Sequence, residues 1–173
     1  GNLDELTVSP NQTNLALALQ KTGKPVVLVL NEGRPRLIER IEPGAAAIVQ
    51  TYLPGNFGGD ALADILSGDI NPSGKLPYTY PKYEQGLITY DHKPGQNIEG
   101  KMEGAYDYGA QTSVQFPFGY GLSYTTFEYS DLQVDRQGVK FTLTNTGKVP
   151  GMEIAQLYVG CQSSKIFRPK KEL

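Results

Sequence analysis

The sequence predicts an α/β fold followed by an all-β region, and three patterns carry that prediction. The continuous apolar run at residues 26–30 is typical of a strand in a parallel sheet that is covered on both faces. A second apolar stretch, residues 45–53, precedes a pattern typical of a helix. From residue 127 onward, apolar and polar residues alternate as in half-buried strands. We therefore predict a three-layer α/β sandwich with a mainly parallel sheet, followed by a truncated all-β, immunoglobulin-like sandwich.

The first helix is predicted to begin after Ser9. The Ser9 hydroxyl can accept a hydrogen bond from the backbone N–H of Gln12, whose side chain can reach back, which is the capping-box pattern. Pro10 suits the first helical position, and Gly23 is expected to end the helix. The residues expected on its apolar face are Leu15, Ala18 and Leu19.

The second helix lies within residues 57–77, the stretch with the densest structural signals. Gly58-Gly59 permits a close backbone approach or a sharp bend before the helix, and Gly68 suits a left-handed stop. Residues 71–74 (Asn-Pro-Ser-Gly) are typical of a turn, and an extended segment is expected at residues 75–80. The apolar face of this helix is expected at Ala61, Leu62, Ile65 and Leu66.

The later part of the chain changes character twice. Residues 82–113 show no clear periodicity and are expected to form a long loop. Residues 116–124 alternate aromatic residues with glycine, which favours core aromatic rings packed against close backbone. The strands expected beyond them begin at Phe127 and cover residues 139–143 and 154–159, too few for a complete sandwich.

We therefore predict two domains, an α/β sandwich at residues 1–124 and a partial β-sandwich at residues 125–173. The incomplete sandwich should leave strand edges unpaired around residues 154–159, and such edges promote aggregation. A chain that ends near Tyr124 is accordingly expected to be better behaved in solution.

Composition argues against several classes of protein. The net charge of −2 does not suit binding to nucleic acid, and no stretch approaches the ~18 apolar residues of a membrane span. Cys161 is the single cysteine, so neither an intrachain disulfide nor a cysteine zinc site is expected. His92 is the single histidine and has no nucleophile-elbow motif beside it, so we interpret it as a solvated loop residue.

Two segments qualify as candidate sites. Residues 55–59 (Gly-Asn-Phe-Gly-Gly) precede a helix, where backbone N–H groups can hold an anion. They lack the phosphate-loop and dinucleotide motifs, and Asp60 and Asp64 would repel phosphate, so a role as scaffold is favoured. Glu32 follows a predicted buried strand at its carboxyl end, the edge that faces ligands in open α/β sheets. The alternatives for Glu32 are an arginine pair or a solvated turn.

Four segments together resemble one protein family. They are residues 23–35, residues 54–68, residues 71–77 and residues 116–127. In this order they strongly resemble the C-terminal α/β sandwich domain of glycoside hydrolase family 3, which contains β-glucosidases and related exo-acting enzymes. Residues 145–159 resemble the opening of the fibronectin type III-like domain that follows in many members. The resemblance implies that the chain is a fragment of a β-glucosidase-type hydrolase and that the parent enzyme is periplasmic or secreted; no signal-peptide pattern is visible from Gly1 onward.

The resemblance also implies which domains of the parent enzyme carry the two catalytic carboxyl groups. The family has an aspartate nucleophile on an N-terminal barrel domain and an acid/base glutamate on the α/β sandwich. By the register of residues 6–12, that glutamate falls a few residues before Gly1, and Glu5 is the alternative candidate for the second carboxyl. We therefore expect no catalytic carboxylate in this chain, no metal and no cofactor, and the substrate-binding residues stay unassigned. The implied partner is an oligosaccharide or β-glucoside bound together with the barrel domain.

Two other function classes remain as alternatives. One is a non-catalytic carbohydrate-binding or scaffold module, in which tyrosines would stack on sugars because the chain has no tryptophan. The other is an α/β nucleotide or phosphate binder, which the aspartates beside residues 55–59 disfavour.

Overall fold

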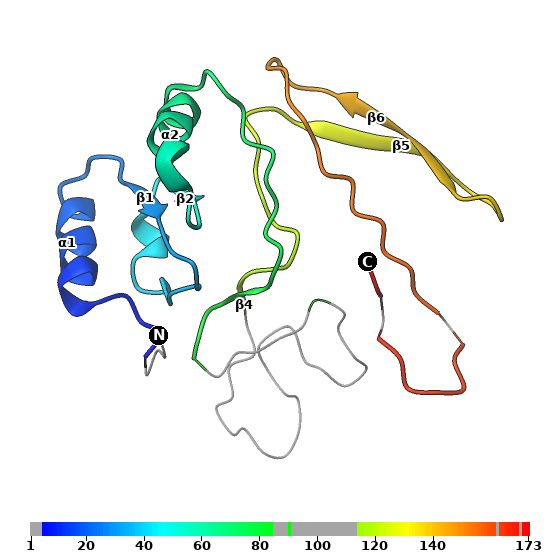
Figure 1. Ribbon diagram of the computed structural model, residues 1–173, viewed down its shortest axis with the longest axis horizontal. Helices are drawn as coiled ribbons and strands as arrows, with labels where there is room; N and C mark the ends of the chain where they lie inside the picture. Colours follow the sequence, from blue (N-terminus) through cyan, green and yellow to red (C-terminus); the bar gives the residue numbers. More distant parts are fainter. Residues whose placement is uncertain (1–4, 85–89, 91–113, 162, 170) are drawn as a thin grey trace.

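The computed structural model describes residues 5–84, 90, 114–161, 163–169 and 171–173. This part of the chain contains two α-helices, two short 3-10 helices and six strands (Figure 1). In chain order they are α1 (Pro10–Gln20), β1 (Val27–Leu30), η1 (Glu42–Gly44), β2 (Ala47–Gln50), η2 (Gly55–Phe57), α2 (Gly58–Ser67), β3 (Tyr80–Pro81), β4 (Val114–Phe116), β5 (Phe127–Val134) and β6 (Val139–Asn145).

The six strands form three pairs. β1 and β2 are parallel, whereas β3 pairs with β4 and β5 pairs with β6 in antiparallel fashion. A parallel pair beside two helices fits the predicted α/β class. The three-layer sandwich within that class stays a prediction, since the sheets of the described residues have two strands each.

The core lies beside α1 and β1. Its buried members are Ala16 of α1, Ile38 and Ile41 of the loop after β1, and Tyr80 of β3. Leu28 and other partly buried residues of β1 and β2 pack against this group. The loop between β1 and β2 therefore supplies as much of the core as the strands do, which hydrophobic periodicity alone does not indicate.

The predicted start of α1 is confirmed, but its predicted apolar face is wrong. Ser9 is the N-cap, and its side chain accepts a hydrogen bond from the Gln12 backbone N–H. Leu15 and Leu19 are 61% and 47% exposed, while Thr13 and Ala16 are buried. The helix turns its smaller residues inward because they permit a close approach to the core.

The prediction that residues 26–30 are covered on both faces is also wrong for this chain. Burial alternates along β1, with Val27 and Val29 exposed at 43% and 40% and Leu28 and Leu30 partly buried. One face of β1 therefore packs on the core, and the other is open among the described residues. The second predicted strand, residues 45–53, is shorter than expected, because η1 precedes it and Tyr52 adopts φ 54° just after it.

The left-handed stop of α2 is confirmed at Gly68, with φ 88°. The turn predicted at residues 71–74 is wrong: these residues run on without a turn, and the extended segment behind them includes strand structure at Tyr80–Pro81 alone. Leu76 instead pairs with residues 119–120: its N–H donates to the Tyr120 carbonyl at 2.8 Å, and its carbonyl accepts from the Gly119 N–H at 2.8 Å. Tertiary pairing thus replaces the local turn that proline and glycine favour.

Among the residues that the structure describes, three long-range polar contacts join the α/β region to the β region. Lys75 Nζ lies 3.2 Å from Glu153 Oε1, with both side chains largely buried. The Asn71 side-chain amide donates to the Pro150 carbonyl at 3.0 Å, and Gln156 donates to the Gly119 carbonyl at 2.9 Å. We call residues 71–76, 117–124 and 150–156 together the joint.

A glycine is required within the joint. A Cβ at Gly121 would overlap the carbonyl oxygen of Gly74 and press against Lys75. The aromatic-glycine alternation at residues 116–124 therefore marks close backbone approach, as the sequence predicts. Its rings stack in part with one another, as for Phe116 and Tyr120 at 5.1 Å between centroids.

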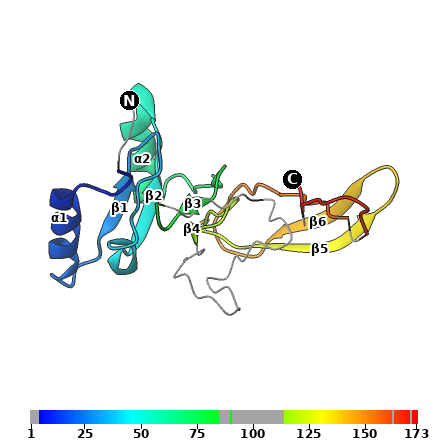
Figure 2. The same cartoon turned by 90° about the horizontal axis from the view of Figure 1, so that it is seen from below.

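β5 and β6 form a long hairpin at the opposite end of the molecule from α1 (Figures 1 and 2). Both predicted strands are confirmed, but the half-buried face expected of them is not, because Phe141 and Leu143 are exposed. The strand predicted at residues 154–159 is wrong: this stretch has an isolated bridge between Val159 and Glu172. The immunoglobulin-like sandwich stays a prediction, since two strands of it are described here.

Candidate functional site

The candidate site lies at the carboxyl ends of β1 and β2, the edge predicted to face ligands. Glu32 follows β1 and is half-buried. Its Oε1 accepts a hydrogen bond from the Tyr80 hydroxyl at 2.8 Å and another from the Arg36 backbone N–H at 3.2 Å. These contacts make Glu32 an anchored group rather than a solvated turn residue, and its proposed place at a cleft edge stays a prediction.

Tyr80 is the most buried side chain of this edge, with 1% exposure. Its hydroxyl lies between two acceptors, Glu32 Oε1 and the Arg36 carbonyl oxygen at 2.7 Å. Burial raises the pKa of Tyr80 well above its ordinary value, and the Glu32 carboxylate raises it further. The phenol therefore stays neutral and acts as a hydrogen-bond donor at this position.

Two further tyrosines continue from Tyr80 along the same edge. Tyr78 lies 6.1 Å from Tyr80 and 6.4 Å from Tyr52, measured between ring centroids. Burial, followed by the charges of Tyr52 and Glu32, raises the pKa of Tyr78 to about 12. The row supplies apolar ring area next to neutral hydroxyl groups, a combination that suits polar ligands with apolar faces.

The end of β2 carries two irregular features. Gln50 Nε2 donates to the Glu32 carbonyl at 3.4 Å, while Gln50 Oε1 is buried without a hydrogen-bond partner among the described residues. Tyr52, two residues later, adopts the left-handed conformation that non-glycine residues rarely use. Backbone strain and an unsatisfied polar atom at a sheet's carboxyl edge are typical of a site rather than of plain scaffold. Sequence reasoning had no local signal for Gln50.

The chain ahead of α1 reaches the same edge. Arg36 Nη1 donates to the Glu5 carbonyl at 3.0 Å, and the Leu37 N–H donates to the Leu6 carbonyl at 2.9 Å. The Glu5 carboxylate itself is exposed and accepts a hydrogen bond from the Thr7 hydroxyl. The structure therefore brings the backbone of Glu5, but not a second buried carboxylate, to the network around Glu32.

The other candidate sites from the sequence, at the start of α2 and at the single cysteine and histidine, have less structural support. α2 begins after η2 without a side-chain cap on its first N–H groups, and Asp60 lies in its first turn, where it would oppose an anionic ligand. Among the described residues no group of three histidine, cysteine or carboxylate side chains could hold a metal ion. Cys161 is exposed, and His92 lies outside the described residues.

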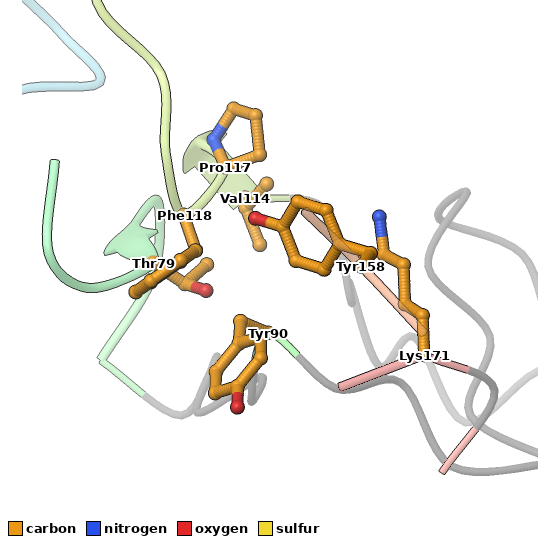
Figure 3. Close-up of a pocket in the computed structure, with 7 residues that line it drawn as sticks. All are labelled: Thr79, Tyr90, Val114, Pro117, Phe118, Tyr158 and Lys171. Atoms are coloured by element: carbon orange, nitrogen blue, oxygen red, sulfur yellow. The ribbon is translucent and has the colours of Figure 1, made fainter. Parts of the chain in front are cut away.

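A shallow hollow lies between the α/β region and the C-terminal residues (Figure 3). Tyr90 stacks on Phe118 with 4.6 Å between ring centroids, and Lys171 Nζ lies 4.7 Å from the centroid of Tyr158. The hollow measures about 60 Å³, far less than the roughly 300 Å³ at which small-molecule sites begin. The hollow is too small to enclose a sugar, and the alternative of a carbohydrate-binding module stays a prediction.

Comparison with known proteins decides the family. The model of the glycosyl hydrolase family 3 C-terminal domain matches residues 2–124. The chain belongs to glycoside hydrolase family 3. The predicted resemblance to the C-terminal domain of this family is thereby confirmed.

Several family 3 relatives extend the match along nearly the whole chain. A periplasmic beta-glucosidase of Salmonella typhimurium is 38% identical over 97% of this chain and 24% of its own length. The beta-glucosidase BoGH3A of Bacteroides ovatus is 40% identical over 94% of this chain, and a beta-xylosidase of Formosa agariphila is 38% identical. The chain spans about a quarter of the length of the curated relatives it matches.

Solved family 3 structures agree with this assignment. The beta-glucosidase from Listeria innocua in complex with glucose superposes with a TM-score of 0.87 at 31% identity, over 99% of this chain and 26% of that enzyme. Beta-glucosidase 3B from Thermotoga neapolitana in complex with glucose gives a TM-score of 0.78 at 30% identity. No helix among the described residues has the length and apolar character needed to cross a membrane.

Proposed function

We propose that this chain is the C-terminal part of a β-glucosidase-type, exo-acting glycoside hydrolase. The observation that supports this most strongly is the family 3 match over residues 2–124, together with relatives of 38–40% identity named beta-glucosidase or beta-xylosidase. The substrate of the complete enzyme is a β-glucoside or an oligosaccharide with a terminal β-D-glucosyl residue. The site of action is the periplasm or the extracellular medium, as for the relative from Salmonella typhimurium.

The proposed mechanism is retaining hydrolysis in two steps. A carboxylate nucleophile attacks the anomeric carbon while a carboxylic acid protonates the leaving oxygen, and water then resolves the glycosyl-enzyme with the same acid now acting as base. Neither carboxyl belongs to this chain: the nucleophile comes from an N-terminal barrel domain, and the acid/base glutamate comes from the segment a few residues before Gly1. Residues 1–124 would form an α/β sandwich domain that lines one side of the sugar pocket. Residues 125–173 would form the start of the fibronectin type III-like domain.

The carboxyl edge of β1 and β2 is the part of this chain that would approach the sugar. It combines the neutral phenols of Tyr52 and Tyr78 with the unpartnered oxygen of Gln50. Since Gln50 Oε1 can accept but not donate, a hydroxyl or N–H from outside the described residues would satisfy it.

The test uses the complete protein that carries this chain. We expect it to hydrolyse 4-nitrophenyl β-glucoside, and nuclear magnetic resonance should show a β-configured first product. The same assay with residues 1–173 alone should give no turnover, because both catalytic carboxyls are absent. Turnover by residues 1–173 would refute the proposed placement of the carboxyls, and an inactive complete protein on β-glucosides and β-xylosides would refute the proposed function.

A further inference from the structure

We propose that Tyr80, Glu32 and Arg36 form a positioning network for the general acid of the complete enzyme. The network holds the backbone ahead of α1 against the carboxyl edge of β1. The inference rests on the proposed function, because it assigns the acid to the segment that leads into Glu5. None of the three side chains needs to touch the substrate, so each is a positioning residue.

The network consists of one buried hydroxyl, which shares its proton between two acceptors, and one backbone hydrogen bond between the residues that supply those acceptors. The Tyr80 oxygen lies 2.8 Å from Glu32 Oε1 and 2.7 Å from the Arg36 carbonyl, and the Arg36 N–H donates to the same Glu32 oxygen at 3.2 Å. Tyr80 is 1% exposed and comes from β3, more than 40 residues along the chain from the other two. The loop after β1 is therefore clamped from a distant part of the chain, and local flexibility of residues 32–36 is suppressed.

Arg36 carries this order across to the segment ahead of α1. With its backbone fixed on both sides, its guanidinium donates to the Glu5 carbonyl at 3.0 Å. The next residue, Leu37, donates to the Leu6 carbonyl at 2.9 Å and forms a parallel bridge with Thr7. Residues 5–7 thus lie beside residues 36–38 through a single isolated bridge. Arg36 is the side chain that holds the backbone at Glu5.

The direction of this segment matters because general acid catalysis depends on geometry. A carboxylic acid must lie within hydrogen-bond reach of the leaving oxygen, and a displacement of about 1 Å costs on the order of 100-fold in rate. The Arg36 guanidinium holds the Glu5 carbonyl at 3.0 Å, at the point where the chain enters from this segment. The competing interpretation is that the network merely stabilises the core, and the two interpretations predict different kinetics.

The first measurement compares leaving groups in the complete enzyme. Cleavage of 2,4-dinitrophenyl β-glucoside requires little protonation of the leaving oxygen, whereas cleavage of 4-methylphenyl β-glucoside requires much. The values of kcat/KM on the two substrates therefore report on the general acid to different degrees. We expect Tyr80→Phe and Arg36→Lys to lower the second value about 10- to 100-fold and to leave the first within about twofold. Tyr124→Phe is the matched control, because it removes a tyrosine hydroxyl bond to the Ile65 carbonyl away from this edge.

Equal losses on both glucosides would refute the positioning role, since a purely structural defect lowers both alike. Unchanged kcat/KM on both would refute it too. Glu32→Gln keeps an acceptor for Tyr80, so it should retain most of the activity that Glu32→Leu loses.

The second measurement is independent of activity and uses residues 1–173. Amide hydrogen exchange at Leu37, whose N–H is bonded to the Leu6 carbonyl, should become about tenfold faster in Arg36→Lys, because a charge-assisted hydrogen bond is lost or weakened. Exchange within β5 and β6 should not change. If the wild-type complete enzyme is inactive, the proposed function fails, and unchanged exchange at Leu37 would separately refute the network.

Discussion

The two ends of the molecule bury apolar surface in different ways. Around α1, β1 and β3 the chain has an internal core, with Ile38 and Tyr80 each 1% exposed. The β5–β6 hairpin has a ring contact between Tyr129 and Phe141 but no buried side chain among the described residues. An isolated two-stranded hairpin is marginally stable in water at best. The first region thus has an internal core, whereas the second depends on the joint and on whatever covers its faces.

Deleting the hairpin region should have the largest effect, because it tests directly whether the two regions depend on each other. A chain of residues 1–124 loses the exposed apolar side chains of β5 and β6, so we expect a higher soluble yield. It also loses Glu153, which leaves Lys75 partly buried without its partner, so its urea midpoint should fall. Sedimentation and urea titration measure the two effects separately. Equal or lower solubility of the shortened chain would contradict the prediction of an incomplete sandwich.

Truncating one apolar side chain in each region should lower the free energy of unfolding by different amounts. We expect Ile38→Ala to lower the free energy of unfolding by about 2–5 kcal/mol, the range for deleting a buried aliphatic side chain. Phe141→Ala, at a position with 39% exposure, should cost less, about 1–2 kcal/mol, because part of the ring already lies in water. Urea unfolding followed by circular dichroism gives both values. A larger cost for Phe141→Ala would mean that the hairpin is covered in solution.

The same contrast shows how far the sequence alone reaches. Elements set by local signals are predicted well: the Ser9 cap, the Gly68 stop and the presence of strands β5 and β6 follow from short-range rules. Features set by distant contacts are missed. The turn expected at residues 71–74 is absent, and the nearby Leu76 pairs with Gly119 and Tyr120. The inward face of α1 is likewise set by its packing on the core.

The residues of the candidate site likewise fall into those that local sequence signals identify and those that depend on distant contacts. Glu32 is found from the sequence because it follows a recognisable strand. The hydroxyl that anchors it belongs to Tyr80, 48 residues away, and no spacing rule links such a pair. Gln50 is marked by an unsatisfied oxygen, which exists once the chain has folded and has no sequence signature.

Substitutions in the joint test whether the stabilities of the two regions are coupled. Lys75→Met leaves the Glu153 carboxylate largely buried without its cation, and we expect the free energy of unfolding to fall by about 1–3 kcal/mol. The double variant Lys75→Met with Glu153→Met removes both charges and should recover part of that loss. Additive losses in the double variant would show that the ion pair does not couple the regions. Urea unfolding of the three variants supplies the cycle.

Alkaline pH should weaken the α/β region through Tyr78 and Tyr80. Burial raises the pKa of Tyr78 from 10.0 to about 12 and raises that of Tyr80 as well. The neutral phenols contribute stability that is fully present below about pH 10, the unfolded value. That stability is lost as pH rises from 10 toward 12, because the unfolded chain ionises first. Unfolding free energies from pH 8 to 12 should fall less steeply in Tyr78→Phe than in Tyr124→Phe, and parallel curves would contradict the shift.

The smallest effect concerns two adjacent glycines at the start of α2. Their backbones are both helical, so alanine at either one gains helix propensity of up to about 1 kcal/mol. A Cβ at Gly59 meets no described atom within 4 Å, whereas a Cβ at Gly58 would overlap the ring of Pro54. We expect Gly59→Ala to raise the free energy of unfolding by about 0.5 kcal/mol and Gly58→Ala to lower it by about 1–3 kcal/mol. Thermal unfolding of both variants decides the point: a gain for Gly58→Ala would show that Pro54 yields freely and that the two glycines are equivalent. A loss for Gly59→Ala would instead indicate that another part of the protein packs on this face of α2, where the described residues leave open space.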